Sequence, residues 1–89
     1  MPNYATLTRN IETINDYDIQ HVVFEDGIGV VTVSDNRTGD WDGHHTTSER
    51  ENTELVKRLK RLVAACGTVN VRRHPAFLIQ RAIEMSVVV

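Results

Sequence analysis

Apolar residues are concentrated in one stretch of the chain, residues 19–34, where two runs rich in valine and isoleucine flank a single polar dipeptide. β-branched residues favour strands, and the dipeptide, Asp26-Gly27, suits a two-residue type I′ turn. The pattern therefore predicts a β-hairpin over residues 19–34. With that turn, Glu25 pairs with Ile28 and Phe24 lies opposite Gly29.

The predicted hairpin carries apolar residues on both faces. One face holds Val22, Phe24, Val31 and Val33, and the other holds Ile19, Val23, Ile28 and Val30. An antiparallel sheet with one face in water normally alternates apolar with polar residues. We therefore expect either helices on both faces or a second subunit on one of them.

The second clear pattern is helical and runs from Ser48 to Cys66. Ser48 and Glu51 have the spacing of a capping box, and apolar residues then recur at helical spacing. The expected buried stripe consists of Leu55, Leu59, Leu62, Val63 and Cys66. Gly67 follows as a suitable C-cap, so the sequence predicts one long helix over residues 48–66.

The N-terminal residues 4–15 give a weaker pattern. Leu7, Ile11 and Ile14 recur at positions i, i+4 and i+7. This spacing predicts a short helix, and a strand is the alternative.

The C-terminal part holds three short segments. Residues 68–72 alternate in polarity like a strand, and the closing residues 86–89, one serine and three valines, also fit a strand. Residues 75–85 fit a helix that begins at Pro75, with an extended segment as the alternative. The expected buried face of that helix is Leu78, Ile79, Ala82 and Ile83.

Together these elements predict a single domain over residues 1–89. Its class is α+β, with a small, mostly antiparallel sheet packed by the long helix and one or two short ones. A chain of this length has one core with little surplus stability. Because both hairpin faces are apolar and the C-terminal Val87, Val88 and Val89 would leave an exposed edge if unpaired, we also expect a homodimer.

Charge is divided unevenly along the chain. Seven of the ten basic residues, but only one of the twelve acidic residues, lie between Leu55 and Val89. The net charge of −2 therefore hides an acidic first part and a basic last part. Such asymmetry bears on the choice of partner rather than on the fold.

The single cysteine, Cys66, has no partner within the chain for a disulfide. Small secreted domains usually carry several disulfides, and the N-terminus shows no leader pattern. No apolar run is long enough to span a bilayer. We therefore expect a cytoplasmic protein without a membrane segment, in which Cys66 serves packing.

Residues 35–47 show no periodic pattern and predict a long acidic loop between the hairpin and the helix. Loops of this length are often functional, and this one holds the only tryptophan, Trp41. An exposed tryptophan among aspartates suits an interface with another protein that is basic or nucleic-acid-binding; the alternative is that Trp41 folds back on the core. The candidate partner-binding residues are Trp41, Asp40, Asp42, Asp35 and His44.

The same loop offers a weak candidate metal site. Asp40, Asp42 and Glu49 occupy carboxylate positions of a calcium loop of the EF-hand type, but the first position is Thr38 and the preceding element is a strand. No phosphate-binding or nucleophile motif is present. We expect no cofactor and no enzymatic activity, and a small metal-dependent enzyme that uses residues 40–49 is the second alternative.

Nucleic-acid binding is the first alternative function. Basic residues that could contact phosphates lie on the long helix and just before the last one: Lys57, Arg58, Lys60, Arg61, Arg72 and Arg73. Contacts of this kind are electrostatic and salt-dependent. Against them, the isoelectric point is near 6.0 and no nucleic-acid-binding motif is present.

The sequence thus favours a small, non-enzymatic protein-interaction module, an inhibitor or modulator of a larger macromolecular machine. In general build it resembles small virus-encoded inhibitors of host machinery. That resemblance rests on composition and carries no motif.

Overall fold

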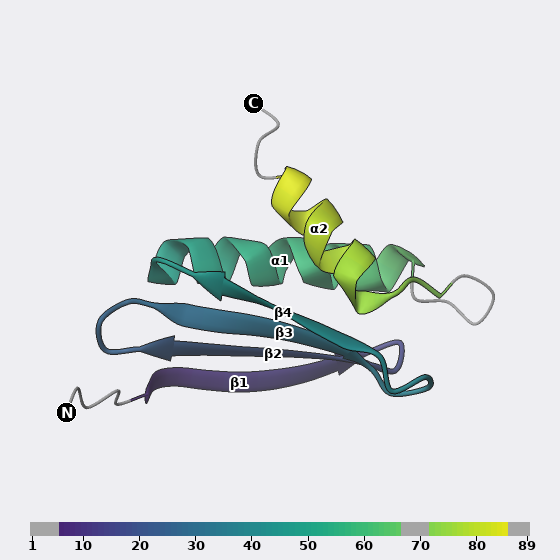
Figure 1. The fold of residues 1–89 in the computed structure, drawn as a ribbon, viewed down its shortest axis with the longest axis horizontal. Coiled ribbons are helices and arrows are strands. Elements are labelled where there is room, and N and C mark those ends of the chain that lie inside the picture. The colour runs from purple at the N-terminus through teal and green to yellow at the C-terminus, as the bar shows by residue number, and fades with distance from the viewer. Residues whose placement is uncertain (1–5, 67–71, 86–89) are drawn as a thin grey trace.

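The computed structural model describes residues 6–66 and 72–85, which form four strands followed by two helices (Figure 1). The strands are β1 (Thr6–Ile14), β2 (Tyr17–Phe24), β3 (Gly29–Asp35) and β4 (Trp41–Thr46), and the helices are α1 (Glu49–Cys66) and α2 (Pro75–Met85). The strands make an antiparallel meander in the order β1-β2-β3-β4. Both helices pack on one face of this sheet, which confirms the α+β class.

The two predicted helices in the second half of the chain are confirmed. α1 begins after Ser48, whose hydroxyl accepts a hydrogen bond from the Glu51 backbone N–H. The Glu51 carboxylate, however, binds the backbone N–H and hydroxyl of Thr47 instead of closing the capping box on Ser48. α2 begins at Pro75 and buries Leu78, Ile79 and Ala82. Neither described helix is long and apolar enough to cross a membrane.

The predicted N-terminal helix is wrong, and the alternative is right: residues 6–14 form β1. This strand pairs with β2, which places Ile14 beside the core and leaves Ile11 on the opposite face, 56% exposed. Pairing with a neighbouring strand therefore overrides the helical spacing of a few apolar residues. The strands predicted at 68–72 and 86–89 lie outside the described residues, except for Arg72, which is in neither strand nor helix.

The predicted hairpin is present, but its register is shifted by one residue. Phe24 pairs with Ile28 through a 2.9 Å hydrogen bond, and the Gly27 N–H donates to the Phe24 carbonyl. The loop therefore has three residues and ends at Gly27, whose φ is +87°. A three-residue loop of this kind ends in a left-handed residue, which glycine adopts without strain.

The one-residue shift changes which side chains share a face. Val23 now lies opposite Gly29, and Ile19 lies opposite Val33. The inner face, under the helices, therefore carries the buried side chains of Tyr17, Ile19, Val23, Val31 and Val33. The outer face carries Val22, Phe24 and Val30 and has no helix over it (Figure 1).

The predicted 35–47 loop is also wrong, because half of it forms β4. The chain turns over residues 36–39, where the Gly39 N–H donates to the Asp35 carbonyl and Gly39 has a φ of +82°. The Asp35 backbone N–H then donates to the Asp40 carbonyl. After this turn β4 pairs with β3 from Ser34 back to Gly29. Polar residues with low strand propensity are held in β4 by this pairing.

Candidate functional site

The outer face of the sheet is the candidate site, and Trp41 is its most prominent side chain. Trp41 is the first residue of β4 and is 67% exposed, so the core alternative for this residue is wrong. Its ring extends along its own strand over Gly43, which has no side chain to displace it. The indole is therefore presented on a paired strand rather than on a loop.

Other apolar side chains lie on the same face. Ile11 on β1 is 56% exposed, and the register places it in the same cross-strand row as Gly43. At the hairpin end, a hollow of about 450 Å³ is lined by Phe24, Asp26, Ile28, Gly29, Val30 and His45. Trp41 and this hollow thus lie at opposite ends of β4, on one side of the sheet.

The strand layer that carries this face is mostly acidic. Residues 6–46 contain eight acidic and two basic residues, whereas the part from residue 49 onward has four acidic and eight basic ones. Asp18 shares a cross-strand row with Trp41, and hydrogen bonds from the Thr13 and Asn36 side chains lower the pKa of its carboxyl. Asp40 is exposed in the adjacent turn. The charge asymmetry of the sequence becomes an acidic sheet beneath a basic helical layer.

The structure separates the five residues that the sequence proposed as one partner-binding site. Trp41 and Asp40 are exposed, whereas Asp42 and His44 point to the inner side of β4 and are half-buried. His44 lies 3.9 Å from the Glu51 carboxylate on α1. Asp35 is 2% exposed and faces the interior. Of the five, only Trp41 is placed to meet a partner at the outer face, because the Asp40 carboxylate, although exposed, lies 4.0 Å from His74 Nε2 on the helical side.

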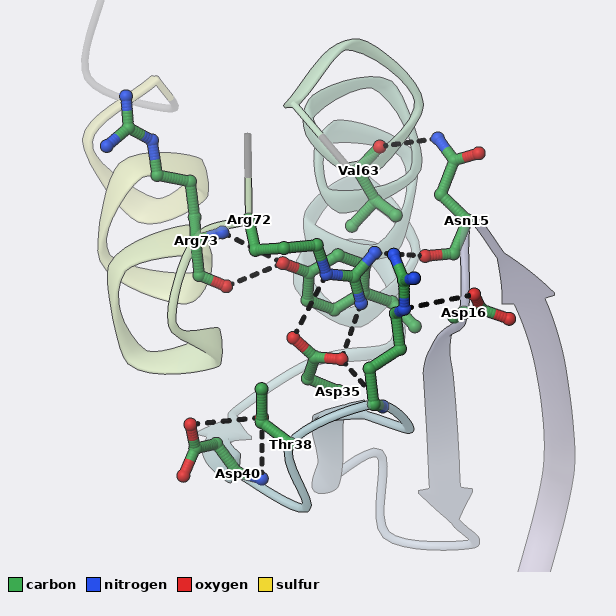
Figure 2. A network of polar contacts seen from close by, with 10 residues as sticks. Asn15, Asp16, Asp35, Thr38, Asp40, Val63, Arg72 and Arg73 are labelled. Atoms are coloured by element: carbon green, nitrogen blue, oxygen red, sulfur yellow. Dashed lines mark hydrogen bonds and ion pairs between the residues drawn. The ribbon is translucent and has the colours of Figure 1, made fainter. Parts of the chain in front are cut away.

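Asp35 forms the centre of a polar cluster that joins the turns of the sheet to the start of α2 (Figure 2). Its carboxylate accepts two hydrogen bonds from the Arg72 guanidinium and one from the backbone N–H of Arg37. Arg72 also donates to the Asn15 carbonyl at 2.7 Å and lies 4.2 Å above the ring of Tyr17. The Tyr17 hydroxyl donates to the Arg73 carbonyl at 2.6 Å.

The cluster holds the Asp35 carboxylate ionised. Burial alone would raise its pKa, but hydrogen bonds from Arg72 and Arg37, together with the Arg72 charge, outweigh burial and keep that pKa below its ordinary value. Perturbed carboxylates can mark catalytic sites. Here the oxygen atoms are occupied by donors from two segments of the chain, the 36–39 turn and Arg72, which is the arrangement of a structural ion pair.

The basic residues proposed for nucleic-acid binding do not form one surface. Arg72 is bound to Asp35, Arg58 donates to the Ala82 carbonyl at 2.9 Å, and Lys60 lies 2.8 Å from Glu12. Lys57, 3.8 Å from Glu54, and Arg61 remain exposed on α1. The Arg73 guanidinium lies over the Phe77 ring instead.

The weak metal candidates are likewise apart. Asp42 is in β4 and Glu49 is the first residue of α1, so the EF-hand reading fails because its central loop is a strand. Among the described residues, no group of three or more His, Cys, Asp or Glu side chains could hold a metal ion.

Sequence reasoning missed Ile11, Gly43 and His45 as neighbours of Trp41. A signal was present: Trp41, Gly43 and His45 alternate with Asp42, His44 and Thr46, and Gly39 before them is a usual hairpin-turn residue.

The chain matches no protein-family model, and the searches found no similar curated protein and no similar solved structure. The argument for function therefore rests on this surface.

Proposed function

We propose that this protein is a non-enzymatic protein-binding module and that its partner docks on the outer face of the sheet, with Trp41 as the anchor. The observation that carries the proposal is the exposure of Trp41 on a paired strand. Tryptophan is the residue type most enriched among energetic hot spots of interfaces. A paired strand fixes the backbone under the indole, so little order has to be gained on binding.

The partner we propose is basic near the contact. Asp18 lies in the cross-strand row of Trp41 and Asp40 precedes Trp41 in the chain, while Asp26 lines the hollow at the other end of β4 and Glu25 precedes it in the same loop. Arg9 is the basic residue on the strands of this face. Acidic groups around an apolar anchor accelerate association with a basic partner and favour it over acidic ones.

The module would act by occupying a surface of its partner. The contacts of the buried Asp35–Arg72 pair are made within the domain, to Arg37 and to Asn15, so this pair offers no site for a substrate. An inhibitor or modulator of a larger assembly is the role that fits such a domain.

The test is a direct comparison of two exposed aromatic residues. Purified protein is immobilised and challenged with an extract of the cells that produce it, and each retained protein is then purified and titrated in solution. Trp41→Ala should weaken binding of the true partner by at least roughly tenfold, the loss expected when a hot-spot anchor is truncated. Phe77→Ala is the matched control, because Phe77 is 51% exposed on α2, in the helical layer.

Salt and nucleic acid complete the test. Affinity for a basic partner should fall as salt rises, because the acidic rim is exposed and screened. Equal loss of binding in both alanine variants, or no loss in either, would contradict the proposal. A salt-dependent shift of duplex or single-stranded nucleic acid that is lost in a Lys57→Glu, Arg61→Glu variant would favour the basic helix instead.

A further inference from the structure

The two edges of the sheet are protected very differently. β1 carries Arg9 and Glu12, its pairing is irregular between Thr6 and Thr8, and Lys60 reaches Glu12 from α1. Charges and irregular pairing are the usual means by which edge strands avoid joining another sheet. β4 has no proline, no lysine and no such irregularity, and glycine lies in its middle.

The hydrogen-bond pattern shows which backbone groups of β4 face outward. The Phe24–Ile28 bond and the Asp35–Asp40 bond fix the alternation along the two hairpins. In an antiparallel ladder every second residue of a strand bonds to one neighbour. Asp42, His44 and Thr46 therefore bond toward β3, and the N–H and C=O groups of Trp41, Gly43 and His45 point away from the sheet.

We propose that a second copy of this chain pairs with β4 along this edge, antiparallel, with Gly43 of each copy on the two-fold axis. In this register Gly43 pairs with Gly43 of the second copy, and Trp41 pairs with His45 of the second copy. In both pairs, the residues of both copies contribute backbone N–H and C=O groups that point away from their own sheet. The inference goes beyond the proposed function, because it concerns the edge of β4 rather than the outer face.

Side-chain chemistry selects this register. On the outer face it sets the Trp41 indole against the His45 imidazole, an aromatic cross-strand pair that stabilises antiparallel strands. On the inner face it sets Asp42 against His44 of the second copy, a carboxylate beside an imidazole. A register displaced by two residues one way would place Asp42 directly opposite Asp42, and like charges in that position are unfavourable.

The symmetry has a consequence for binding. A two-fold axis perpendicular to the sheet keeps both outer faces on the same side. The dimer would have a continuous eight-stranded sheet, with all helices on one side and two Trp41 side chains on the other. Because α2 contacts β4 and β3 in each chain, the two α2 helices would lie over the new junction and cover it.

The first experiment measures mass and amide exchange. Sedimentation or light scattering over the micromolar range should give twice the 10.1 kDa of one chain. His45→Pro removes an outward N–H, which an edge strand tolerates when unpaired, and it should convert the dimer to a folded monomer. His45→Ala, the matched control, keeps the N–H and should remain dimeric. In the unaltered protein, dilution should dissociate the dimer. The amide hydrogens of Gly43 and His45 should then exchange faster with solvent.

The second experiment tests the register. In a Cys66→Ala background, Gly43→Cys places two thiols on the axis, where paired Cα atoms are about 5.5 Å apart and within disulfide range. Mild oxidation should convert it almost completely to a covalent dimer. Thr53→Cys, exposed on α1, should stay uncrosslinked.

Each contrary outcome has a clear meaning. A monomer at all concentrations overturns the inference. So does a dimer whose mass and Gly43 exchange are unaffected by His45→Pro, because its contact would then lie elsewhere. If His45→Pro does not fold, dilution-dependent exchange at Gly43 and the cysteine pair still decide. None of these readouts uses the docking partner, so the proposed function stands or fails separately.

Discussion

The two faces of the sheet differ in how much of their chemistry is already satisfied within the molecule. On the inner face Tyr17, Val31 and Val33 are completely buried under α1 and α2. On the outer face Trp41 on β4 and Ile11 on β1 are more than half exposed, although they belong to the same sheet. One sheet thus has a face that holds the fold together and a face with apolar area left for a partner.

Polar groups follow the same division. Buried polar groups are costly unless they are hydrogen-bonded, and on the inner face Asp35 and the Asn52 NH2 group meet this demand, whereas His21 Nδ1 and Asn52 Oδ1 are buried without a hydrogen-bond partner among the described residues. The Asn52 amide donates to the Val22 carbonyl and to the Thr46 hydroxyl, and Asp35 is saturated by Arg72 and Arg37. Substitutions on the inner face should therefore cost stability, and those on the outer face should cost binding.

The largest expected effect is at Asp35. Asp35→Asn keeps the size of the side chain but removes the charge that balances Arg72, which is bound in the same cluster. Breaking a buried ion pair on one side typically costs about 3 kcal/mol. Urea unfolding should show this loss, whereas Asp40→Asn, in the exposed turn, should change stability by less than about 0.5 kcal/mol. Equal, small effects would show that the cluster does not hold the fold.

The second expected effect is at Gly29, where α1 approaches the sheet closely. A Cβ there would lie 2.3 Å from the Val22 carbonyl oxygen and 2.7 Å from the Asn52 amide nitrogen. Gly29→Ala should lower the free energy of unfolding by about 2 kcal/mol, as overpacking does. Gly43→Ala is the matched control on the outer face, where the nearest atom is the Thr32 methyl at 3.2 Å. It should cost clearly less in the same denaturation experiment.

Acid should weaken the inner face through Asp35. The pKa of the Asp35 carboxyl is lower in the folded state than in the unfolded chain. The contribution of Asp35 to the free energy of unfolding is therefore complete above the ordinary pKa of 3.8. The contribution is lost as the pH falls through the folded-state pKa. Asp18 and Glu51, whose pKa values are also lowered by hydrogen bonds, act in the same direction. Asp35→Asn should show a shallower loss of melting temperature with acid, and an unchanged slope would contradict the argument.

The smallest effect on stability is expected at Trp41. Trp41→Ala removes a side chain that is 67% exposed. The free energy of unfolding should therefore change by less than about 0.5 kcal/mol. Tryptophan emission in the unaltered protein should be that of a solvated indole and should shift to shorter wavelength when a partner binds. A large destabilisation, or blue-shifted emission in the free protein, would place the indole in the core and remove the distinction between the faces.

The sequence by itself determined the elements with strong local signals. Ser48 and the apolar spacing after it defined α1, Pro75 began α2, and β-branched residues around Asp26-Gly27 defined the hairpin. In each case the information lies within a few residues: a cap, a fixed φ, or side chains that favour one backbone geometry. The sequence also drew attention to Trp41 but left its exposure open, which the structure decides at 67%.

Only the tertiary structure decided the register, the N-terminal strand, β4 and the role of Asp35. One residue of loop length at Gly27 changed which β3 side chains share a face with those of β2, and weak local preference cannot fix such a choice against packing. β4 exists because β3 offers it a complete ladder, despite its polar sequence. Asp35 and Arg72, 37 residues apart, were assigned to opposite binding hypotheses. The fold pairs them because a buried carboxylate needs a cation, and no local pattern records which one it meets.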